Sequence, residues 1–169
     1  SPYVMGRDDT RYPFQKIFET ADLASMLRAE DIPALKNALK ASDSAVRYWA
    51  ALGILMRGGS GLESARDEML AAFTDTSPYV RITAAEALGR YGRAGDLGQA
   101  LGVLADLGAM DKNGFFVSIA ALNAIDALGR KATPILERIK QFPGQGQIPD
   151  ARYGSYVPRL LEDIAANLK

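Results

Sequence analysis

DSAVRYWAALG, residues 43–53, decides the fold of this chain, because its pattern returns at residues 77–89 (SPYVRITAAEALG) and 117–129 (VSIAALNAIDALG). Each copy carries a valine and then, at four-residue steps, an alanine, a branched aliphatic residue and a glycine. The positions are Val46, Val80 and Val117; Ala50, Ala84 and Ala121; Ile54, Leu88 and Ile125; and Gly58, Gly92 and Gly129. Steps of four predict one face of a helix that the glycine ends.

The spacing of the copies indicates stacked repeats. Val46 and Val80 are 34 residues apart, and Val80 and Val117 are 37 residues apart. Self-similarity at such a period is typical of helical solenoids, in which units stack on one another. The residues predicted to end the first helices, Leu39, Phe73 and Leu107, are spaced by 34 and 34. The third repeat therefore carries three extra residues in the turn between its helices, near residues 110–114.

Several repeat families have units of about this length. The 34-residue period equals that of tetratricopeptide repeats, but their Trp-Leu-Gly-Tyr pattern is missing. Ankyrin repeats need a Thr-Pro-Leu-His element, which a chain without histidine cannot have. A short HEAT-like repeat fits better, because Asp or Pro precedes Val-Arg, and Ala-Ala and Leu-Gly follow, in residues 43–53 and 77–89.

These signals predict an all-α fold. The predicted architecture is an α-solenoid, a HEAT/armadillo-like superhelix of about three and a half to four helix-pair repeats preceded by an N-terminal helix. An extended lead-in is expected over residues 1–12 and a single domain over 13–169, with repeats at about 32–59, 61–92, 95–130 and 131–169. The last repeat is expected to have a first helix over about 133–141 and a closing helix from about Ser155. Asp43-Ser44 and Thr76-Ser77-Pro78 are predicted to cap two second helices.

Composition limits the partners of the chain. It has 169 residues, of which 48% are hydrophobic and 24% charged, as in ordinary soluble globular proteins. Twenty basic and twenty acidic residues cancel, so no global field attracts nucleic acid or an anionic membrane. No apolar run approaches the roughly 20 residues that a membrane span needs. The start at Ser1-Pro2, without an initiator methionine or a signal peptide, is interpreted as that of a trimmed or mature fragment.

Cysteine and histidine are both absent. Their absence excludes Cys and His nucleophiles, histidine general bases, Ser-His-Asp triads and ordinary zinc or haem sites, and no cofactor is predicted. Carboxylate chemistry and oxygen-ligated magnesium or calcium sites remain open. The acidic pairs Asp8-Asp9 and Glu162-Asp163 are interpreted as solvated charge, because the first lies in the lead-in and the second on a polar helix face.

Residues 43–53, 77–89 and 117–129 together resemble the helical extension that follows the catalytic domain in many bacterial sulfatases. The segments at residues 12–14, 21–24 and 156–160 are similar too, so the resemblance spans about 12–168. Sulfatases use formylglycine made within a Cys/Ser-x-Pro-x-Arg motif and bind metal partly through histidine, and this chain has neither that motif nor histidine. The resemblance therefore implies a non-catalytic accessory domain in the periplasm or outside the cell. Its implied partner is the catalytic domain of its own parent protein or another protein.

Two further function classes stay open from the sequence. A free-standing HEAT-like scaffold would grip a peptide or a folded protein on its concave face. Enzymatic or nucleic-acid work is known among HEAT-like solenoids such as bilin lyases and DNA glycosylases. The neutral charge argues against DNA, and no residue pattern marks a lyase site.

Arg47, Trp49 and Arg81 are the candidate contact residues of the repeats. Arg47 and Arg81 share one repeat position, so they could form a basic ladder for a sulfated sugar or a phosphate. The structural alternative is that each guanidinium binds a carboxylate or a helix-end carbonyl of a neighbouring repeat, and Ser118 at the third position favours it. Trp49 could anchor a partner, although its helical spacing also fits the core.

Residues 142–153 are the candidate contact loop. Long irregular loops are uncommon in compact repeats and are often functional. Gln145, Gln147 and Tyr153 would supply contacts to a peptide or a sugar, and simple disorder is the alternative. No Gly-Lys-Ser/Thr occurs, so the segment is not a phosphate-binding loop.

Overall fold

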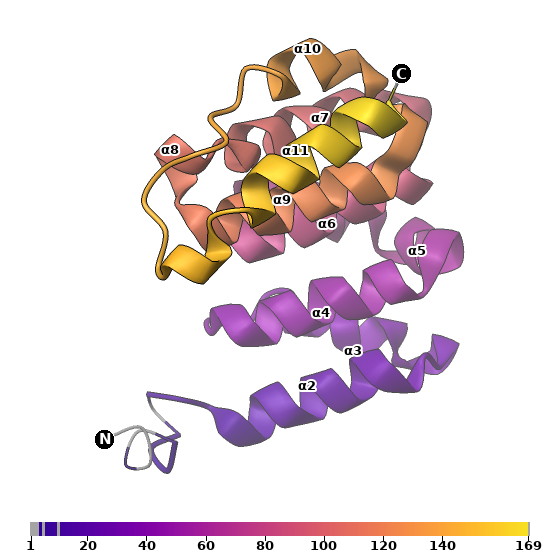
Figure 1. Cartoon of the computed structure of the whole chain (residues 1–169). Coiled ribbons are helices and arrows are strands. Elements are labelled where there is room, and N and C mark those ends of the chain that lie inside the picture. The colour runs from indigo at the N-terminus through magenta and orange to yellow at the C-terminus, as the bar shows by residue number, and fades with distance from the viewer. Residues whose placement is uncertain (1–3, 5, 10, 169) are drawn as a thin grey trace.

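The protein is an arched stack of helices in two layers (Figure 1). The computed structural model describes residues 4, 6–9 and 11–168, and no strand occurs among them. Helices that follow one another in the chain pack across the two layers, and helices of neighbouring repeats pack within a layer. The all-α solenoid predicted from the repeated motif is confirmed.

One layer holds the N-terminal helix and the second helix of each repeat. Its members are α2 (Phe14–Met26), α4 (Ser44–Met56), α6 (Pro78–Tyr91), α9 (Phe115–Leu128) and α11 (Tyr156–Asn167). Each of them contacts the next in this order, so α2 and α11 lie at opposite ends of the layer (Figure 1).

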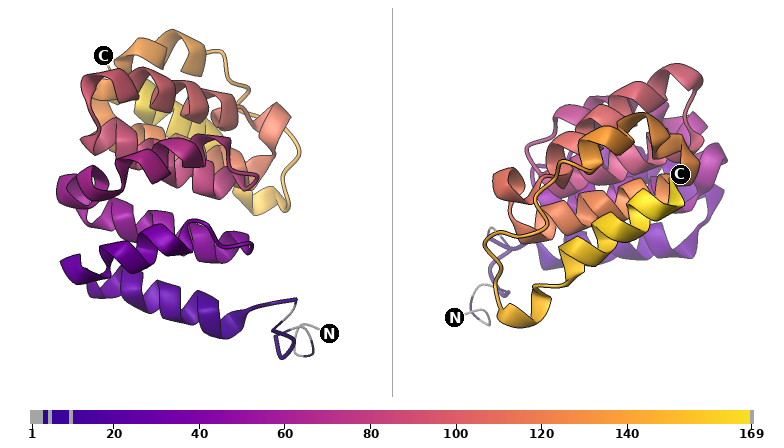
Figure 2. Two further views of the ribbon diagram at one scale, coloured as in Figure 1. Left: turned by 180° about the vertical axis from the view of Figure 1, so that it is seen from behind. Right: turned by 45° about the horizontal axis from the view of Figure 1, so that its top comes forward.

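The other layer is seen from behind in the left view of Figure 2. Its members are α3 (Ile32–Ala38), α5 (Gly58–Ala71) with the 3-10 turn η2 (Ala72–Thr74), α7 (Ala94–Gly108), the 3-10 segment η3 (Gly129–Ile135) and α10 (Leu136–Ile139). Three short elements lie in the connections: η1 (Ala29–Asp31), α8 (Met110–Asn113) and η4 (Ala151–Tyr153).

The register of the repeated motif is confirmed by burial. Its alanines and its aliphatic residues are all 0% exposed, namely Ala50, Ala84, Ala121, Ile54, Leu88 and Ile125. Asp43 caps α4 as predicted, because its Oδ1 accepts hydrogen bonds from the N–H groups of Ala45 and Val46. Two of the motif glycines at the helix ends, Gly58 and Gly129, have positive φ angles of 64° and 54°, which glycine adopts without strain.

A glycine inside the motif sets the distance between α2 and α4. A Cβ atom added to Gly53 would lie 3.0 Å from the Cα and 3.0 Å from the Cβ of Ala24. The backbone of α2 therefore blocks a side chain at this position. Gly102, inside α7, is the opposite case, because no heavy atom lies within 4 Å of an added Cβ.

Alanine at these two glycines is expected to change stability in opposite directions. Gly102→Ala should raise the free energy of unfolding by up to about 1 kcal/mol, because alanine is the better helix former. Gly53→Ala has the same intrinsic gain, but it must push α2 away from α4, so we expect a net loss of about 1–2 kcal/mol. Urea denaturation of both variants measures the difference. If the two variants are equally stable, α2 can move away from α4 without a loss of stability.

The fourth repeat differs from the prediction in its first helix. Instead of one helix over residues 133–141, the chain forms η3 and then a single α-helical turn, α10. Pro134 lies inside η3 and has no N–H group to donate back along a regular helix. The closing helix is present as α11, with Val157 and Ile164 buried. The three extra residues of the third repeat correspond to α8, which ends at Gly114 with a φ of 77°.

The expected lead-in over residues 1–12 is described only in part, since residues 1–3, 5 and 10 lie outside the described residues. Within the described part, the N–H groups of Arg11 and Tyr12 donate to the carbonyl oxygen of Asp8. This part is therefore turned rather than extended. The domain boundary at residue 12 and the boundaries of the repeats stay predictions.

Candidate functional site

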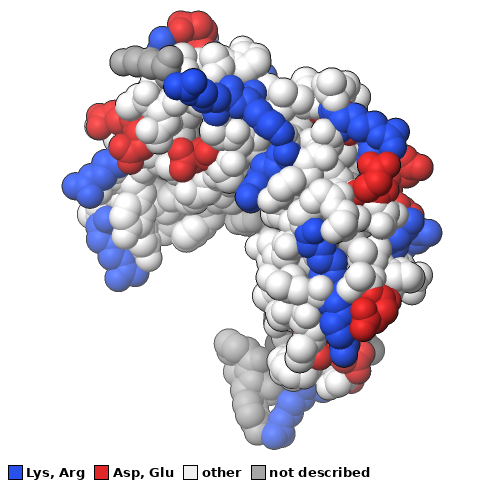
Figure 3. All heavy atoms as spheres, turned by 90° about the vertical axis from the view of Figure 1, so that its right-hand side faces the viewer, with Lys and Arg blue, Asp and Glu red and all other residues white. Residues whose placement is uncertain are grey.

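The layer of second helices forms a hollowed face. In Figure 3 the molecule is turned so that the face seen in Figure 1 lies on the left. The arch is hollow on this face. The part of the hollow visible in this view is lined mostly by uncharged residues, with basic side chains reaching its edge, whereas most acidic and basic side chains lie on the outside of the arch. The visible part of the hollow therefore offers few charges to a polyanion.

The six candidate residues lie in two separate places. Arg47 and Trp49 on α4 and Arg81 on α6 belong to neighbouring repeats, and Gln145, Gln147 and Tyr153 lie between α10 and α11.

Arg47 joins two repeats. Its Nε and Nη2 atoms donate to the two carboxylate oxygens of Asp75 at 2.7 and 2.9 Å. Its Nη1 donates to two backbone carbonyls just before α4, and the side chain is only 12% exposed. Arg81 donates from Nε to the carbonyl of Phe73 at 3.0 Å. The Asp75 bonds favour the structural alternative for Arg47, whereas Arg81 binds a carbonyl of its own repeat. Ligand binding by either arginine stays a prediction.

The same repeat position has one role in all three copies. Ser118, which replaces the third arginine, is fully buried and donates to the carbonyl oxygen of Gly108 at 2.6 Å. Arg47, Arg81 and Ser118 thus each donate to a carbonyl at or just after the end of the first helix in their own repeat. The position satisfies helix-end carbonyls, which otherwise lack a partner.

A cavity with aromatic walls lies close to Trp49, whose role in partner binding stays a prediction. Trp49 is partly buried, packs against the core and meets the ring of Tyr48 edge-on, with centroids 6.1 Å apart. Tyr48 and Tyr79 line a cavity of about 320 Å³ at the N-terminal ends of α4 and α6. The two tyrosines do not share a repeat position, so the repeated pattern contained no signal for this pair.

A carboxylate of a neighbouring repeat was expected as one partner of Arg47, but the other ion pairs between adjacent repeats were not predicted. Asp96, only 1% exposed, accepts hydrogen bonds from Nε of Arg66 at 2.9 Å and from the N–H of Arg93 at 2.8 Å. The pairs that cross a repeat boundary join residues 28, 30 or 32 positions apart, just short of one repeat. Opposite charges at that separation are the sequence signal that would have found them.

These bonds lower the pKa values of two carboxylates. The bond from Arg66 is the main cause of the lowered pKa of Asp96, and it outweighs the burial that would raise it. Burial is the largest influence on Asp75 and raises its pKa, but hydrogen bonds from Arg47 and from the N–H of Ser77 together lower the pKa below its ordinary value. Both carboxylates therefore hold protons less tightly in the folded chain than in the unfolded chain.

Stability is expected to fall in acid through these two groups. A lowered folded-state pKa stabilises the fold above the unfolded-state value of about 3.9, and this contribution is lost as the pH falls toward the folded-state pKa. The free energy of unfolding should thus fall steeply below about pH 4. Asp96→Asn should be less stable at pH 7 and lose less on acidification, as urea denaturation between pH 3 and pH 7 would measure. The exposed Asp126 gives the control, Asp126→Asn, and equal acid losses in both variants would contradict the assignment.

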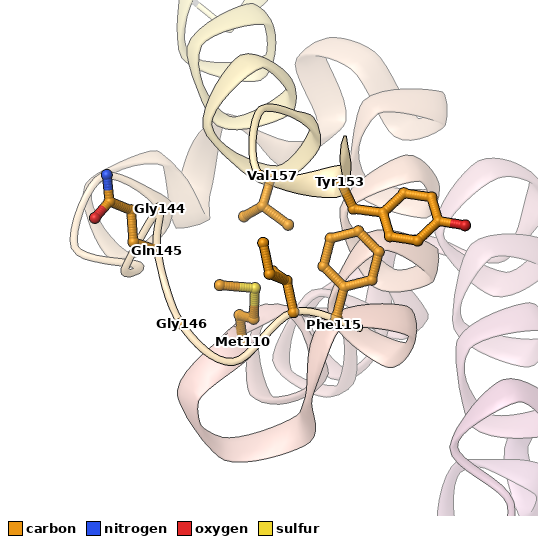
Figure 4. Close-up of a pocket in the computed structure, with 9 residues that line it drawn as sticks. Met110, Phe115, Gly144, Gln145, Gly146, Tyr153 and Val157 are labelled. Atoms are coloured by element: carbon orange, nitrogen blue, oxygen red, sulfur yellow. The ribbon is translucent and has the colours of Figure 1, made fainter. Parts of the chain in front are cut away.

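The segment between α10 and α11 encloses one side of a cavity of about 210 Å³ (Figure 4). Its walls include the side chains of Met110, Phe115 and Val157, and the ring of Tyr153 lies 5.5 Å from that of Phe115. The side chain of Gln145 points away from these groups (Figure 4). Tyr153 and Gln145 both line the cavity, and the ring of Tyr153 lies beside that of Phe115.

A second cavity of about 420 Å³ lies next to the first and shares Met110, Phe115 and Ile148 with it. Gln147 and the exposed ring of Phe116 are among its other walls. The structure therefore brings Gln145, Gln147 and Tyr153 together around two adjoining cavities, the smaller one mainly apolar and the larger one of mixed polarity. Met110 and Phe115 were not predicted as site residues.

The surfaces around the candidate residues offer groups that could bind a partner, namely aromatic rings, cavities with apolar walls and backbone hydrogen-bonding groups. Across the part of the chain that the structure describes, no three carboxylates gather where they could hold a metal ion, and no helix is long and apolar enough to cross a bilayer.

Comparison with known proteins adds a family. No curated protein matches the chain in sequence. The sequence model for HEAT repeats matches residues 32–126, a range that begins with α3 and ends inside α9. This match covers more than half of the chain and contains the first two copies of the motif and most of the third. The chain therefore belongs to the HEAT repeat family.

Proposed function

We propose that the chain is a non-catalytic interaction scaffold whose partner is the catalytic domain of a sulfatase-like hydrolase in the same polypeptide. HEAT repeats suit an interaction scaffold, because stacked helix pairs present extended surfaces. The choice of partner is supported by the resemblance of residues 12–168 to the extensions of sulfatases. The observation that carries it is the exposed face of α2.

Aromatic side chains cover the start of α2. Phe14 and Phe18 are 52% and 58% exposed, and their rings stack with centroids 6.2 Å apart. Tyr12 adds a third ring at 6.4 Å from Phe14, and Leu27 is 51% exposed just after the helix. End units of a solenoid need a polar outer face to remain soluble, and contiguous exposed apolar groups mark interaction sites. This face is where we expect the hydrolase domain to dock.

Hydroxyl-radical footprinting tests this proposal. The isolated chain is compared with the polypeptide encoded by the whole reading frame that contains residues 1–169. Labelling of Phe14 and Phe18 is expected to fall several-fold in the longer polypeptide, because a docked domain would cover both rings. Phe116, which is also 58% exposed, is the matched internal control and should keep its labelling. The hydrolase proposal fails if the frame encodes no sulfatase-like domain, or if Phe14 and Phe18 are labelled equally in both forms.

A free-standing scaffold is the second candidate function, supported by the hollow of Figure 3 and by the cavity between Tyr48 and Tyr79. In that case a partner is expected to protect these two tyrosines rather than the rings of α2. Tyr48→Ala and Tyr79→Ala would then weaken partner capture, while Phe14→Ser would leave it unchanged. The opposite pattern would favour the hydrolase partner.

A further inference from the structure

The backbone N–H and C=O groups between Pro143 and Pro149 have no hydrogen-bond partners among the described residues. Backbone hydrogen bonds stop at Phe142 and resume at Asp150, whose carbonyl oxygen accepts from the N–H of Tyr153. No N–H or C=O group of residues 144–148 forms a hydrogen bond with any other residue that the structure describes. Five consecutive peptide groups are thus available to an outside partner.

Residues 144–148, here named the strap, alternate between two sides as an extended strand does. Gly146 is exposed, but its side-chain direction points at the buried Met110, because an added Cβ would lie 2.8 Å from Cε of Met110. Ile148 also packs against the core, whereas Gln145 and Gln147 are exposed. The strap is therefore anchored by one face, and it presents unpaired peptide groups as an edge strand does.

The two cavities beside the strap differ in chemistry. The smaller one, about 210 Å³, has the apolar walls of Phe115 and Val157 and fits one bulky apolar side chain. The larger one includes the carboxylate of Asp111, which is exposed and pairs with no cation among the described residues. Its surroundings therefore favour a basic side chain next to apolar groups.

We infer that the strap binds an extended, basic peptide segment of another protein. The peptide lies along residues 144–148 as an added strand, places a bulky apolar side chain in the smaller cavity and sets a lysine or arginine beside Asp111. Pairing of the two backbones supplies affinity, and the cavities select side chains. Alternate side chains of an extended peptide lie about 7 Å apart on one face. Because the two cavities adjoin and share three lining residues, we expect the apolar and basic residues to be two positions apart.

A small apolar molecule would use only part of this site. It could fill the smaller cavity, but it would leave the peptide groups of the strap and Asp111 without partners. A peptide engages all three features at once. The strap lies beside α11, at the opposite end of the layer from α2, so this inference does not depend on the hydrolase partner (Figure 1).

The probe is a library of random heptapeptides displayed on phage and selected against the whole chain. Enriched peptides are expected to carry a bulky apolar residue with Lys or Arg two positions away. Gln147→Pro removes one free N–H group and should weaken these peptides about fivefold, as expected for one lost hydrogen bond. Gln147→Ala keeps that N–H group and should change binding less than twofold. Asp111→Asn should reduce the preference for basic peptides, and Asp126→Asn should not.

Peptide analogues test the inference on the unchanged chain, in case Gln147→Pro does not fold. In an extended peptide only every second N–H group points toward the strap, so N-methylation of one alternate set of nitrogens should abolish binding and N-methylation of the other set should not. The inference is overturned if no peptide is enriched over an unrelated helical protein, or if both alternately N-methylated analogues bind as well as the unmodified peptide. It is also overturned if indole binds at Tyr153 while peptides do not, since that result would indicate a small-molecule cavity. Phe14→Ser in α2 should leave peptide binding unchanged, which separates this site from the proposed hydrolase contact.

Discussion

Leu88→Ala is expected to lower the free energy of unfolding by about 3 kcal/mol, within the range of about 2–5 kcal/mol for fully buried leucines. Leu88 is 0% exposed and lies on α6, which contacts α4, α5, α7 and α9. The truncated side chain would leave a cavity among helices that neighbouring repeats hold in place from both sides. Such a site can collapse little, so most of the cavity cost should remain.

Urea denaturation followed by circular dichroism measures this loss. Met56→Ala is the control, because Met56 is 46% exposed at the end of α4 and should cost under about 0.5 kcal/mol. Repeats are stabilised mainly by their neighbours. A weakened α6, at the centre of the stack, should therefore also make the urea unfolding transition broader. A loss below about 1 kcal/mol would show that α6 is not the centre of the cooperative unit.

The inward-facing residues of the stack were predictable because helix periodicity is local. Ala50 and Ile54 lie one turn apart on one face of α4, and their counterparts in α6 and α9 are buried in the same register. Turn chemistry was local as well, so Asp43 could be identified as a cap. By contrast, Pro134 disrupted the expected helix, because the missing N–H mattered more than the apolar spacing.

The candidate sites were harder to predict because they depend on contacts between distant residues. Gly146 approaches Met110 only after α8 has been placed, and no local pattern links the two positions. Tyr48 and Tyr79 meet at one cavity although they lie in different repeats and at different repeat positions. For Arg47 the sequence allowed either ligand binding or a bond to a neighbouring repeat. Its two hydrogen bonds to Asp75 favour the second role.

Arg57 shows most clearly what the repeated motif could not reveal. Its side chain is only 4% exposed, and it follows directly after α4. Its guanidinium donates to carbonyl oxygens at the end of α2 and of α4, at 2.8 Å to Leu23, 3.2 Å to Ala24 and 2.8 Å to Gly53. Burial lowers the pKa of Arg57, and the nearby carboxylate of Asp31 partly offsets that effect.

Lys131 makes a similar contact two repeats later. Its Nζ donates to the carbonyl oxygens of Gly89 and Arg90 at the end of α6. In both cases a cation that follows one helix of this layer binds the end of the preceding helix in the same layer. The last carbonyls of a helix lack partners within it, and their partial negative charge favours a cation. These two residues therefore hold adjacent repeats together at the helix ends.

Arg57→Met is expected to lower the free energy of unfolding by about 2–4 kcal/mol, because it leaves buried carbonyls of α2 and α4 without donors. Arg57→Lys should recover only part of this loss, since an ammonium group cannot reproduce the planar fork that reaches several carbonyls. Arg130→Met is the matched control, because Arg130 is exposed and forms no ion pair with the described residues. Hydrogen exchange should show the loss first in α2, while α9 and α11 keep their protection. If α2 stays as protected as in the unchanged chain, Arg57 does not fasten the first helix to the stack.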